Sequence, residues 1–600
     1  EASVSANDHP ELRGMFNDFL REVYGGDEQA LRATWGEAAR FGEVPFKSPP
    51  APTDWADLRW LDLNLFRRRL VERWLRTNVE AMRAVNTRHP ITDEYYLLPG
   101  GDAGEANRYC DFVNIHCYDI DRPEQLKYYD HAAEGMGFAV GEFSKRSHPS
   151  FVSGWGWAPE PEVRRWYMHL VSACLGAGGT LICNWDWKDM ESCIFPWGLV
   201  YPCDLVPKGQ FYVFRALSET LRHVKLTYAP PAVYVLIPDL HVLRGPDDLA
   251  GWLPARRCIA ALLRIGVPFG VLHDTNIEKL PKEAKLVFYP SPFTLTDATF
   301  DWATQFVRRG GTLYVSGDLS YDERGRRTKA SRLTELCGVE DGGALYAPRG
   351  LPDERLPVTP HIAEIESYSA APCLTVKPLA ASLLASAGDV PALLENSVGQ
   401  GRVLLSTAPL ELFADGPPRQ LYEFVLSRAG IEQLRIDGDD GGLTIMLPPQ
   451  RSGCLAALYR EASTPAEVAL LGARLRIIPR NWGIVATDET QTPYFLAGQG
   501  FVASDGFEVR AERDEPILVA SDSPLGKTTS VTLAVVPVQV DPYRAVALQI
   551  RWAGASGISV EAGETADGKW RVLCTPKAER VGGNWKIEVP AGLIVRLQKR

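Results

Sequence analysis

The 600-residue sequence lacks the features that define several large protein classes. It has no uninterrupted apolar run near the roughly 18 to 20 residues that a bilayer span requires, so we expect no membrane partner. It has no long run of one charge sign, and 64 basic against 75 acidic residues give a net charge of −11, which argues against a nucleic-acid partner. Because 45% of the residues are hydrophobic and 23% are charged, a disordered chain is also excluded.

The cysteines lack the spacing of a metal site or a disulfide framework. None of the eleven forms a C-x-x-C pair, so we expect free thiols and no structural zinc. Free thiols favour a cytoplasmic location, although the compartment itself stays unknown. We expect six cysteines that lie close together in the sequence to be buried: Cys110, Cys117, Cys174, Cys183, Cys193 and Cys203.

Residues 1–228 alternate helical segments with short apolar runs. Apolar residues at helical spacing predict helices from Pro10 to Tyr24 and from Leu61 to Val85, the second with Trp74, Met82 and Val85 on its apolar face. Alternation of this kind predicts parallel strands, whose carboxyl ends collect the chemistry of such folds. The four expected strands are 94–98, 112–118, 138–142 and 180–187.

Two further regions complete the predicted α/β fold class. Residues 229–431 alternate strands and helices again and predict a doubly wound sheet. Residues 432–600 contain short β-rich runs separated by turn residues, which predicts an all-β region with one sandwich of about 110 residues and additional strands beside it. Four tryptophans of this region are expected in the core rather than on a carbohydrate site: Trp482, Trp552, Trp570 and Trp585.

Tryptophan is concentrated at the amino-terminal end. Ten of the 16 tryptophans fall within the first 200 residues. A tryptophan-rich core is one interpretation. The other is a cleft in which aromatic faces pack against sugar rings.

Three successive strand ends carry polar or aromatic side chains. His116 and Tyr118 lie on one side of their strand by alternation, and Glu142 ends the next strand directly after a glycine, which lets neighbouring backbone approach. The following strand ends in Asn184-Trp185-Asp186-Trp187. A core histidine and a solvent-facing glutamate are the alternative interpretations. Together, however, these groups suit glycosidic bond cleavage, because a carboxylate attacks, neighbouring donors orient it and an indole packs under the sugar.

These residues resemble the retaining (β/α)8-barrel glycoside hydrolases, and most closely the family 42 β-galactosidases. The likeness is carried by segment 9–36, from His9-Pro10-Glu11-Leu12 to Trp35-Gly36, by the strand into Glu142, and by Asn184-Trp185 followed by Glu191. It covers most of residues 1–430. The resemblance implies that 1–228 form the second half of a (β/α)8 barrel, that 229–431 form an amidotransferase-like trimerisation domain, and that the chain assembles as a trimer or dimer.

The resemblance also implies the roles of individual residues. The acid/base glutamate falls on Glu1 and the nucleophile on Glu142. His116 and Tyr118 would orient the nucleophile, Asn184 and Glu191 would bind sugar hydroxyls, and Trp185 with Trp187 would form the sugar platform. No cofactor is implied. The zinc-binding cysteines of some family members have no counterpart in residues 2–16.

Several alternatives stay open. Counted from Glu1, only strands five to eight fit before residue 228, so we expect the first half of the barrel to be left out or supplied by a separate polypeptide. Glu1 is otherwise a terminal residue without a role. Phe195-Pro196-Trp197 departs from the family's galactose-binding residues, so β-mannosides and β-glucosides remain alternative substrates.

Two rival functions also remain. One is a catalytically inactive carbohydrate-binding or scaffold protein on the same barrel. The other is an amidotransferase-like enzyme, which the missing cysteine in residues 286–292 disfavours.

Overall fold

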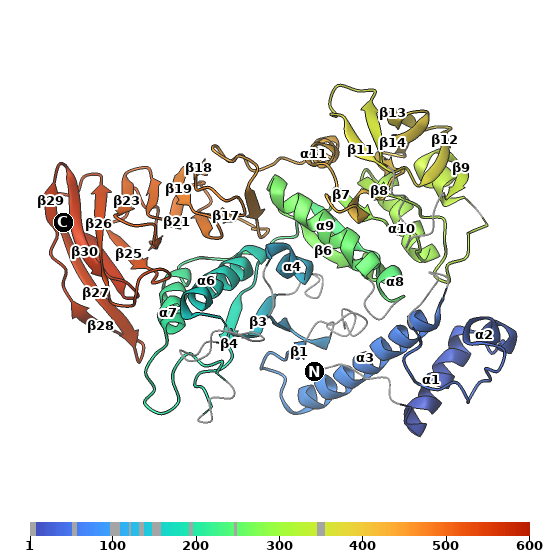
Figure 1. Cartoon of the computed structure of the whole chain (residues 1–600), viewed down its shortest axis with the longest axis horizontal. Coiled ribbons are helices and arrows are strands. Elements are labelled where there is room, and N and C mark those ends of the chain that lie inside the picture. The colour runs from blue at the N-terminus through green and yellow to red at the C-terminus, as the bar shows by residue number, and fades with distance from the viewer. Residues whose placement is uncertain are drawn as a thin grey trace.

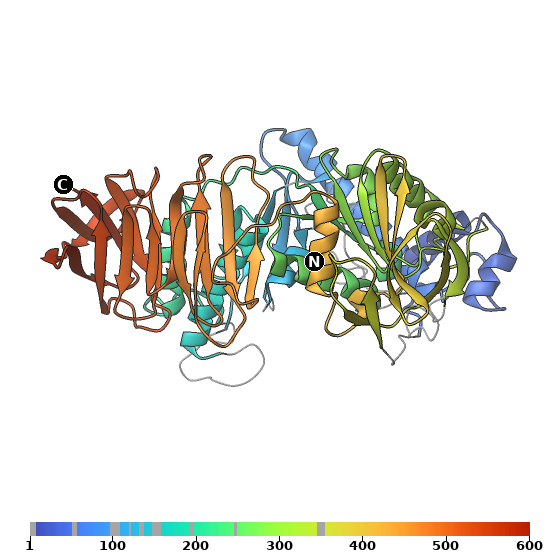
Figure 2. The same ribbon diagram turned by 90° about the horizontal axis from the view of Figure 1, so that it is seen from above.

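The computed structural model describes residues 8–50, 57–95, 109–118, 122–130, 137–146, 158–190, 196–244, 249–329, 331–344 and 355–600. A small parallel sheet lies at the centre of the elongated molecule (Figures 1 and 2). The C-terminal β-sheets lie on one side of it, and a larger α/β sheet with the amino-terminal helices lies on the other. No helix among the described residues is long and apolar enough to span a bilayer.

Three helices begin the described chain: α1 (Pro10–Val23), α2 (Glu28–Trp35) and α3 (Arg59–Val85). They pack around aromatic residues such as Phe16 and Phe66. The predicted apolar face of α3 is buried at Leu63 and Phe66, but farther along the helix the buried side is formed by Val71, Leu75 and Val79. Trp74, Met82 and Val85 are 53%, 45% and 91% exposed, because they do not lie on the side of the helix that packs into the central core.

The central sheet has four parallel strands in the order β1-β2-β3-β4. This confirms the parallel order predicted from the alternating pattern. Its strands are β1 (Glu94–Tyr95), β2 (Val113–His116), β3 (Phe138–Phe143) and β4 (Leu181–Asn184), and its helices are α4 (Pro123–Tyr128), α6 (Glu160–Ala177) and α7 (Gly209–Leu221).

Helix α6 joins the central sheet to the C-terminal region. Almost every residue from Val163 to Ala177 is buried, because α6 lies between the sheet and the β-rich region. His169 accepts a hydrogen bond from the buried indole of Trp482, and the Arg164 guanidinium donates to the backbone oxygens of Pro537 and Val540.

The middle region contains a nine-stranded sheet in the order β11-β10-β13-β14-β15-β8-β7-β5-β6. Its parallel part confirms the predicted doubly wound pattern, whereas the antiparallel extension was not predicted. Strands β9 and β12 form a separate pair. The elements are β5 (Val233–Ile237), α8 (Asp239–Val242), α9 (Leu249–Ile265), β6 (Gly270–His273), β7 (Leu286–Pro290), α10 (Asp297–Arg308), β8 (Thr312–Ser316), β9 (Val339–Ala344), β10 (Leu356–Pro360), β11 (Tyr368–Ala370), β12 (Leu374–Pro378), β13 (Ser382–Ala387), β14 (Val390–Val398), β15 (Gly401–Ser406) and α11 (Arg419–Arg428).

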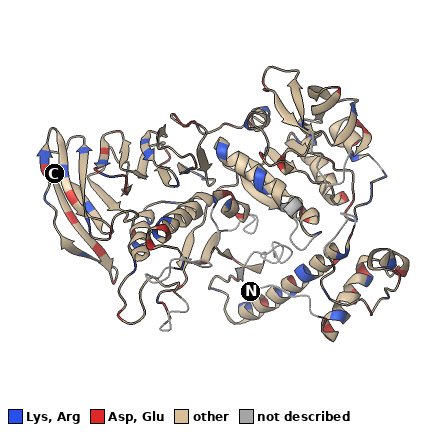
Figure 3. Cartoon of the chain, viewed as in Figure 1, with Lys and Arg blue, Asp and Glu red and all other residues tan. Residues whose placement is uncertain are grey.

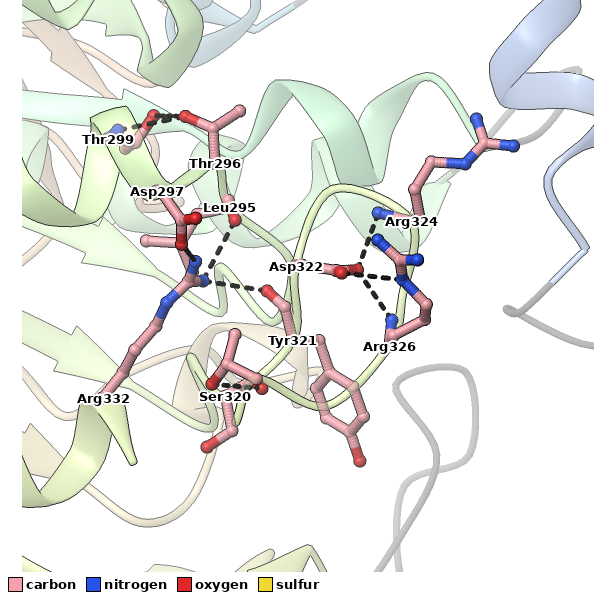
Figure 4. A network of polar contacts seen from close by, with 11 residues as sticks. Leu295, Thr296, Asp297, Thr299, Ser320, Tyr321, Asp322, Arg324, Arg326 and Arg332 are labelled. Atoms are coloured by element: carbon pink, nitrogen blue, oxygen red, sulfur yellow. Dashed lines mark hydrogen bonds and ion pairs between the residues drawn. The ribbon is translucent and has the colours of Figure 1, made fainter. Parts of the chain in front are cut away.

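Helix α3 docks on this middle region through polar contacts. Arg68 forms a buried ion pair with Asp239, and Asp62 pairs with Arg324 at 2.7 Å. Arg324 extends toward α3 from a turn in which Asp322 accepts hydrogen bonds from backbone and guanidinium groups (Figure 4). Arg332 anchors the base of this turn through the backbone oxygens of Leu295 and Tyr321 and through Asp297.

The C-terminal region consists of one nine-stranded and one seven-stranded antiparallel sheet, larger than the predicted sandwich. Trp482 and Trp552 are buried in the core as expected, while Trp570 and Trp585 are only partly buried. The strands are β16 (Leu443–Met446), β17 (Cys454–Arg460), β18 (Ala466–Leu470), β19 (Ala473–Ile477), β20 (Trp482–Thr487), β21 (Pro493–Gln499), β22 (Phe501–Ser504), β23 (Phe507–Ala511), β24 (Pro516–Ala520), β25 (Ser530–Val535), β26 (Ala545–Trp552), β27 (Ile558–Ala566), β28 (Lys569–Cys574), β29 (Glu579–Val581), β30 (Asn584–Pro590) and β31 (Ile594–Lys599).

Candidate active site

The carboxyl ends of β2 and β3 bring three of the predicted site residues together. His116 pairs with Glu142 across the two parallel strands, after a register shift that follows Ile115. The backbone N–H of Cys117 donates to the Glu142 backbone oxygen at 2.9 Å, which continues the pairing to the end of β3. The two strand ends therefore hold His116, Tyr118 and Glu142 in one place.

Two polar side chains contact the Glu142 carboxylate. The Tyr118 hydroxyl donates a short hydrogen bond to Glu142 Oε1, and His116 Nε2 lies 3.4 Å from Glu142 Oε2. The side chains of His116 and Glu142 are 11% and 16% exposed, so the carboxylate is largely shielded but still reaches solvent. This geometry differs from both the core histidine and the solvent-facing glutamate of the alternative interpretations.

Gly141 is required by the packing next to this carboxylate. A Cβ atom at position 141 would lie 1.8 Å from Asn114 Oδ1, far inside van der Waals contact. The expectation of a close neighbouring backbone is therefore corrected, because the group that passes Gly141 is the side chain of Asn114 on β2. The absence of a side chain at 141 lets β2 and β3 stay in register beside Glu142.

Asn184 lies at the end of β4, and both its amide oxygen and its amide nitrogen form hydrogen bonds within the protein. The Tyr167 hydroxyl donates to Asn184 Oδ1 at 2.5 Å, and Asn184 Nδ2 donates to the Asp186 backbone oxygen at 2.7 Å. Burial raises the pKa of Tyr167, so its hydroxyl keeps the donated proton at neutral pH. The orientation of the amide is thus set by α6 and by the chain that follows β4.

The two tryptophans after β4 are exposed. Trp185 and Trp187 are 42% and 59% exposed, which leaves indole surface available to a ligand. The backbone N–H of Trp185 donates to the Phe143 backbone oxygen at 2.8 Å, so this segment is tied to the end of β3. The Trp187 ring packs edge-on against Phe211 of α7, with 6.1 Å between ring centroids.

Trp197 belongs to the same group of residues, although the sequence interpretation noted it only as a departure from the family. Its ring meets Tyr118 edge-on at 5.1 Å, and the Arg146 guanidinium lies 4.5 Å from its centroid. The Ser144 hydroxyl donates to the Trp197 backbone oxygen at 2.5 Å. Trp197 therefore supports the phenol that bonds Glu142, a role that only tertiary structure reveals.

A buried ion pair fixes the chain that leads to Trp197. Lys208 Nζ lies 2.7 Å from Asp189 Oδ2, and both side chains are fully buried. Asp189 also accepts a hydrogen bond from the Gly198 backbone at 2.7 Å. Because an unpaired buried charge is costly, this pair holds the segment after β4 against the amino-terminal end of α7.

The remaining sequence predictions have mixed outcomes. Glu1, Glu191 and Cys193 lie outside the described residues. Cys110, Cys117 and Cys174 are buried as expected, but Cys183 and Cys203 are exposed, because they lie on β4 and on a surface turn. No group of three or more His, Cys, Asp or Glu side chains in the described ranges is placed to hold a metal ion.

Known proteins share this fold at low sequence identity. No family model matches the sequence, and no curated protein matches it significantly. A catalytic mutant of Gan42B, a family 42 β-galactosidase from G. stearothermophilus, matches with a TM-score of 0.63 and 16% identity over 79% of this chain and 75% of that chain. A β-galactosidase from Bacillus circulans sp. alkalophilus matches at 0.60 and 15% over 78% and 76%. One from Halorubrum lacusprofundi matches at 0.60 and 18% over 79% and 75%.

The chain thus has the mixed α/β fold of glycoside hydrolases with a β-rich C-terminal region. Within that class, its fold is that of the family 42 β-galactosidases, as the resemblance implied.

Proposed function

We propose that this protein is a retaining β-glycoside hydrolase in which Glu142 is the nucleophile. The observation that carries the proposal is the Glu142 carboxylate at a parallel-strand end, contacted by the Tyr118 hydroxyl and by His116. The β-galactosidase fold supports the same class of reaction.

In the first step, a Glu142 oxygen attacks the anomeric carbon while the glycosidic C–O bond breaks. An acid protonates the leaving oxygen, and the product is a glycosyl ester on Glu142. In the second step, water loses a proton to the same group, now a base, and attacks the anomeric carbon, so the ester bond breaks and the β-configuration returns. Glu1 is the proposed acid/base.

The Tyr118 hydrogen bond serves this cycle in a specific way. The bond stabilises the carboxylate before attack, and the phenol stays beside the oxygen that carries the sugar in the ester. His116 lies beside the second oxygen and restricts rotation of the carboxylate away from the anomeric carbon. Trp185 and Trp187 form the platform for the sugar, while Asn184 and Glu191 are proposed to bind its hydroxyls.

The proposal includes a second half-barrel beside the central sheet. In the part of the chain that is described, β4 pairs with β3 but with no strand on its other side, and Leu181 on β4 is 49% exposed. Four further parallel strands, encoded upstream or supplied by a separate polypeptide, would cover this edge and close a barrel. Activity tests therefore use the chain together with the segment that supplies these strands.

The proposed domain boundaries are 1–228, 229–431 and 432–600, with assembly as a trimer or dimer through 229–431. β-Galactosides are the first candidate substrates, because the matched structures are β-galactosidases. β-Mannosides and β-glucosides are the alternatives in the same assay.

Replacing Glu142 tests the function directly. With aryl β-galactosides, β-mannosides and β-glucosides as substrates, Glu142→Gln should lower kcat at least about a thousandfold, because the amide is not a nucleophile. Glu162→Gln, in the exposed first turn of α6, is the matched control and should retain full activity. Undiminished turnover by Glu142→Gln contradicts the assignment, and a wild type that binds sugars without cleaving them indicates the inactive scaffold instead.

A further inference from the structure

A groove rich in arginine lies between the central sheet's helices and the middle region, and its lining includes none of the candidate site residues. It has a volume of about 700 Å³ and is lined by the start of α4, one side of α9 and residues 414–419. Five arginines contribute to its lining: Arg122, Arg256, Arg257, Arg264 and Arg419. Basic residues are visible along α9 in Figure 3.

The two acidic residues of the groove offset this charge only in part. Asp415 gives both carboxylate oxygens to Arg355, which lies outside the lining, at 2.7 Å each. Glu124 is largely shielded, and burial raises its pKa, while the charges of Arg122 and Arg256 oppose that rise. Its nearest ion-pair contact, to Arg122, is long at 3.9 Å.

The five arginines differ in their partners. Arg264 pairs with Glu461 at 3.3 Å and Arg419 with Glu423 at 2.8 Å. Arg256 and Arg257 take part in no ion pair within the described ranges, and Arg257 donates only to the Glu411 backbone oxygen at 3.2 Å. Burial lowers the pKa of Arg257, and the negative charge of Asp415 opposes that shift only in part. The groove therefore carries five arginines against two carboxylates, and Glu124 and Asp415 offset the charges of Arg256 and Arg257 only in part.

The first turn of α11 adds to the positive potential. This ten-residue helix begins at Arg419, and its N-cap residue Pro418 offers no side-chain hydrogen bond to the first backbone N–H groups. Gly416, Pro417 and Pro418 all line the groove, so these N–H groups lie at its edge. A helix amino terminus favours an anion in the same place as the arginines.

We propose that this groove binds a small molecule that carries a tetrahedral oxyanion ester, such as a sugar phosphate or sugar sulfate. The planar guanidinium matches two oxygens of such a group, so Arg256 and Arg257 would bind the ester. The volume falls within the roughly 300 to 1,000 Å³ of small-molecule sites and is larger than a bare ion needs, which leaves room for the sugar.

Calorimetric titration with glucose 6-phosphate, galactose 6-sulfate and inorganic phosphate tests the proposal. Both sugar esters should bind the wild type more tightly than inorganic phosphate does, and more weakly as salt is added. A ratio of the two ester affinities that changes between pH 5.5 and 7.5 identifies the phosphate ester as the preferred ligand, because only its second ionisation lies near pH 6.

Arg256→Gln should weaken ester binding about tenfold or more, because a charge-assisted contact is lost. Arg571→Gln, an exposed arginine on β28, is the matched control and should bind normally. Arg256 makes no described side-chain bond, so its replacement is not expected to disturb the fold, and circular dichroism checks this. Absence of ester binding by the wild type, or equal binding by Arg256→Gln, overturns the proposal.

Chemical modification of arginine tests ester binding in the wild-type protein, without a variant. Phenylglyoxal modifies accessible arginines, and saturating sugar ester should slow modification of the peptide that carries Arg256 and Arg257. Equal modification rates with and without ester overturn the proposal. A change in oligomeric mass for Arg256→Gln without ester binding by the wild type also overturns it, and identifies the groove as a contact between copies.

Discussion

At the scale of single residues, the site depends on how one carboxylate is held. Glu142 has a phenol on one oxygen and an imidazole beside the other, and Trp197 packs against the phenol. A strand-end glutamate without such contacts would rotate freely and lose entropy on reaching the attacking geometry. The neighbours of Glu142, rather than the glutamate alone, define the candidate site.

Removing the Tyr118 hydroxyl tests this arrangement. Tyr118→Phe should lower kcat about 10- to 100-fold with a small change in KM, because a hydrogen bond to a charged group is worth about 1.5 to 3 kcal/mol. Steady-state kinetics on the best aryl glycoside measures the effect. Tyr109→Phe, a phenol that contacts Glu72 at 3.3 Å on another part of the molecule, serves as control. Unchanged kcat in Tyr118→Phe would show that the bond plays no part in turnover.

At the scale of elements, the register of β2 and β3 decides whether the site exists. A shift of one residue along a strand moves every side chain to the opposite face, so the contact between His116 and Glu142 depends on this pairing. Asn114 fills the space over Gly141 and fits only because that residue has no side chain.

Gly141→Ala should therefore destabilise the protein by about 1 to 3 kcal/mol, because the added methyl group displaces Asn114 in a packed sheet. Gly14→Ala is the matched control, since a Cβ at position 14 of α1 meets nothing within 4 Å. That change should leave stability equal or raise it by about 0.5 to 1 kcal/mol. Urea unfolding measures both, and equal stability of Gly141→Ala and the wild type would refute the packing argument.

At the scale of the whole molecule, a buried polar cluster connects α3 with the middle region. Arg68 pairs with Asp239, and His273 Nδ1 lies 3.0 Å from the same carboxylate. Asp274 lies beside them, bonded to the Tyr289 hydroxyl at 2.6 Å. Burial and the negative charge of Asp239 raise the pKa of Asp274 from 3.8 to about 7.

This pKa shift predicts how stability depends on pH. The folded protein binds a proton on Asp274 more tightly than the unfolded chain does, so the contribution is complete below about pH 4 and is lost as pH rises toward 7. Asp274→Asn should remove this contribution and make the slope of Tm against pH between 4 and 7 more positive than in the wild type. Asp301→Asn, an exposed residue of α10, should keep the wild-type slope. Calorimetry between pH 4 and 7 measures Tm. Equal slopes of Tm against pH for Asp274→Asn and the wild type would contradict the raised pKa of Asp274.

The sequence predicted those parts of the molecule that have local signals. The parallel strands of 112–143, helix α9 ending before Gly266, and the grouping of His116, Tyr118 and Glu142 all follow from periodicity and strand-end position. The antiparallel extension formed by β11, β10, β13 and β14 was not predicted, because the burial of its residues is set by long-range pairing. Trp197, Arg146 and Asn114 act through tertiary contacts that no sequence pattern marks.

Helix α3 also shows where prediction from sequence fails. Trp74, Met82 and Val85 have the spacing of a buried face, yet they are exposed in the described chain. Helical periodicity alone does not decide which side of a helix is buried, and here Val71, Leu75 and Val79 pack into the core instead. These three exposed side chains and the open edge of β4 are consistent with the proposed second half-barrel.

The most direct test is to trap the proposed covalent intermediate. A 2-deoxy-2-fluoro-β-glycosyl fluoride slows both steps but leaves a good leaving group, so the glycosyl-enzyme should accumulate. Mass spectrometry should then show one added sugar per chain, located by peptide sequencing on Glu142 and absent from Glu142→Gln. A label on another residue, or full turnover without any label at 142, would contradict the account.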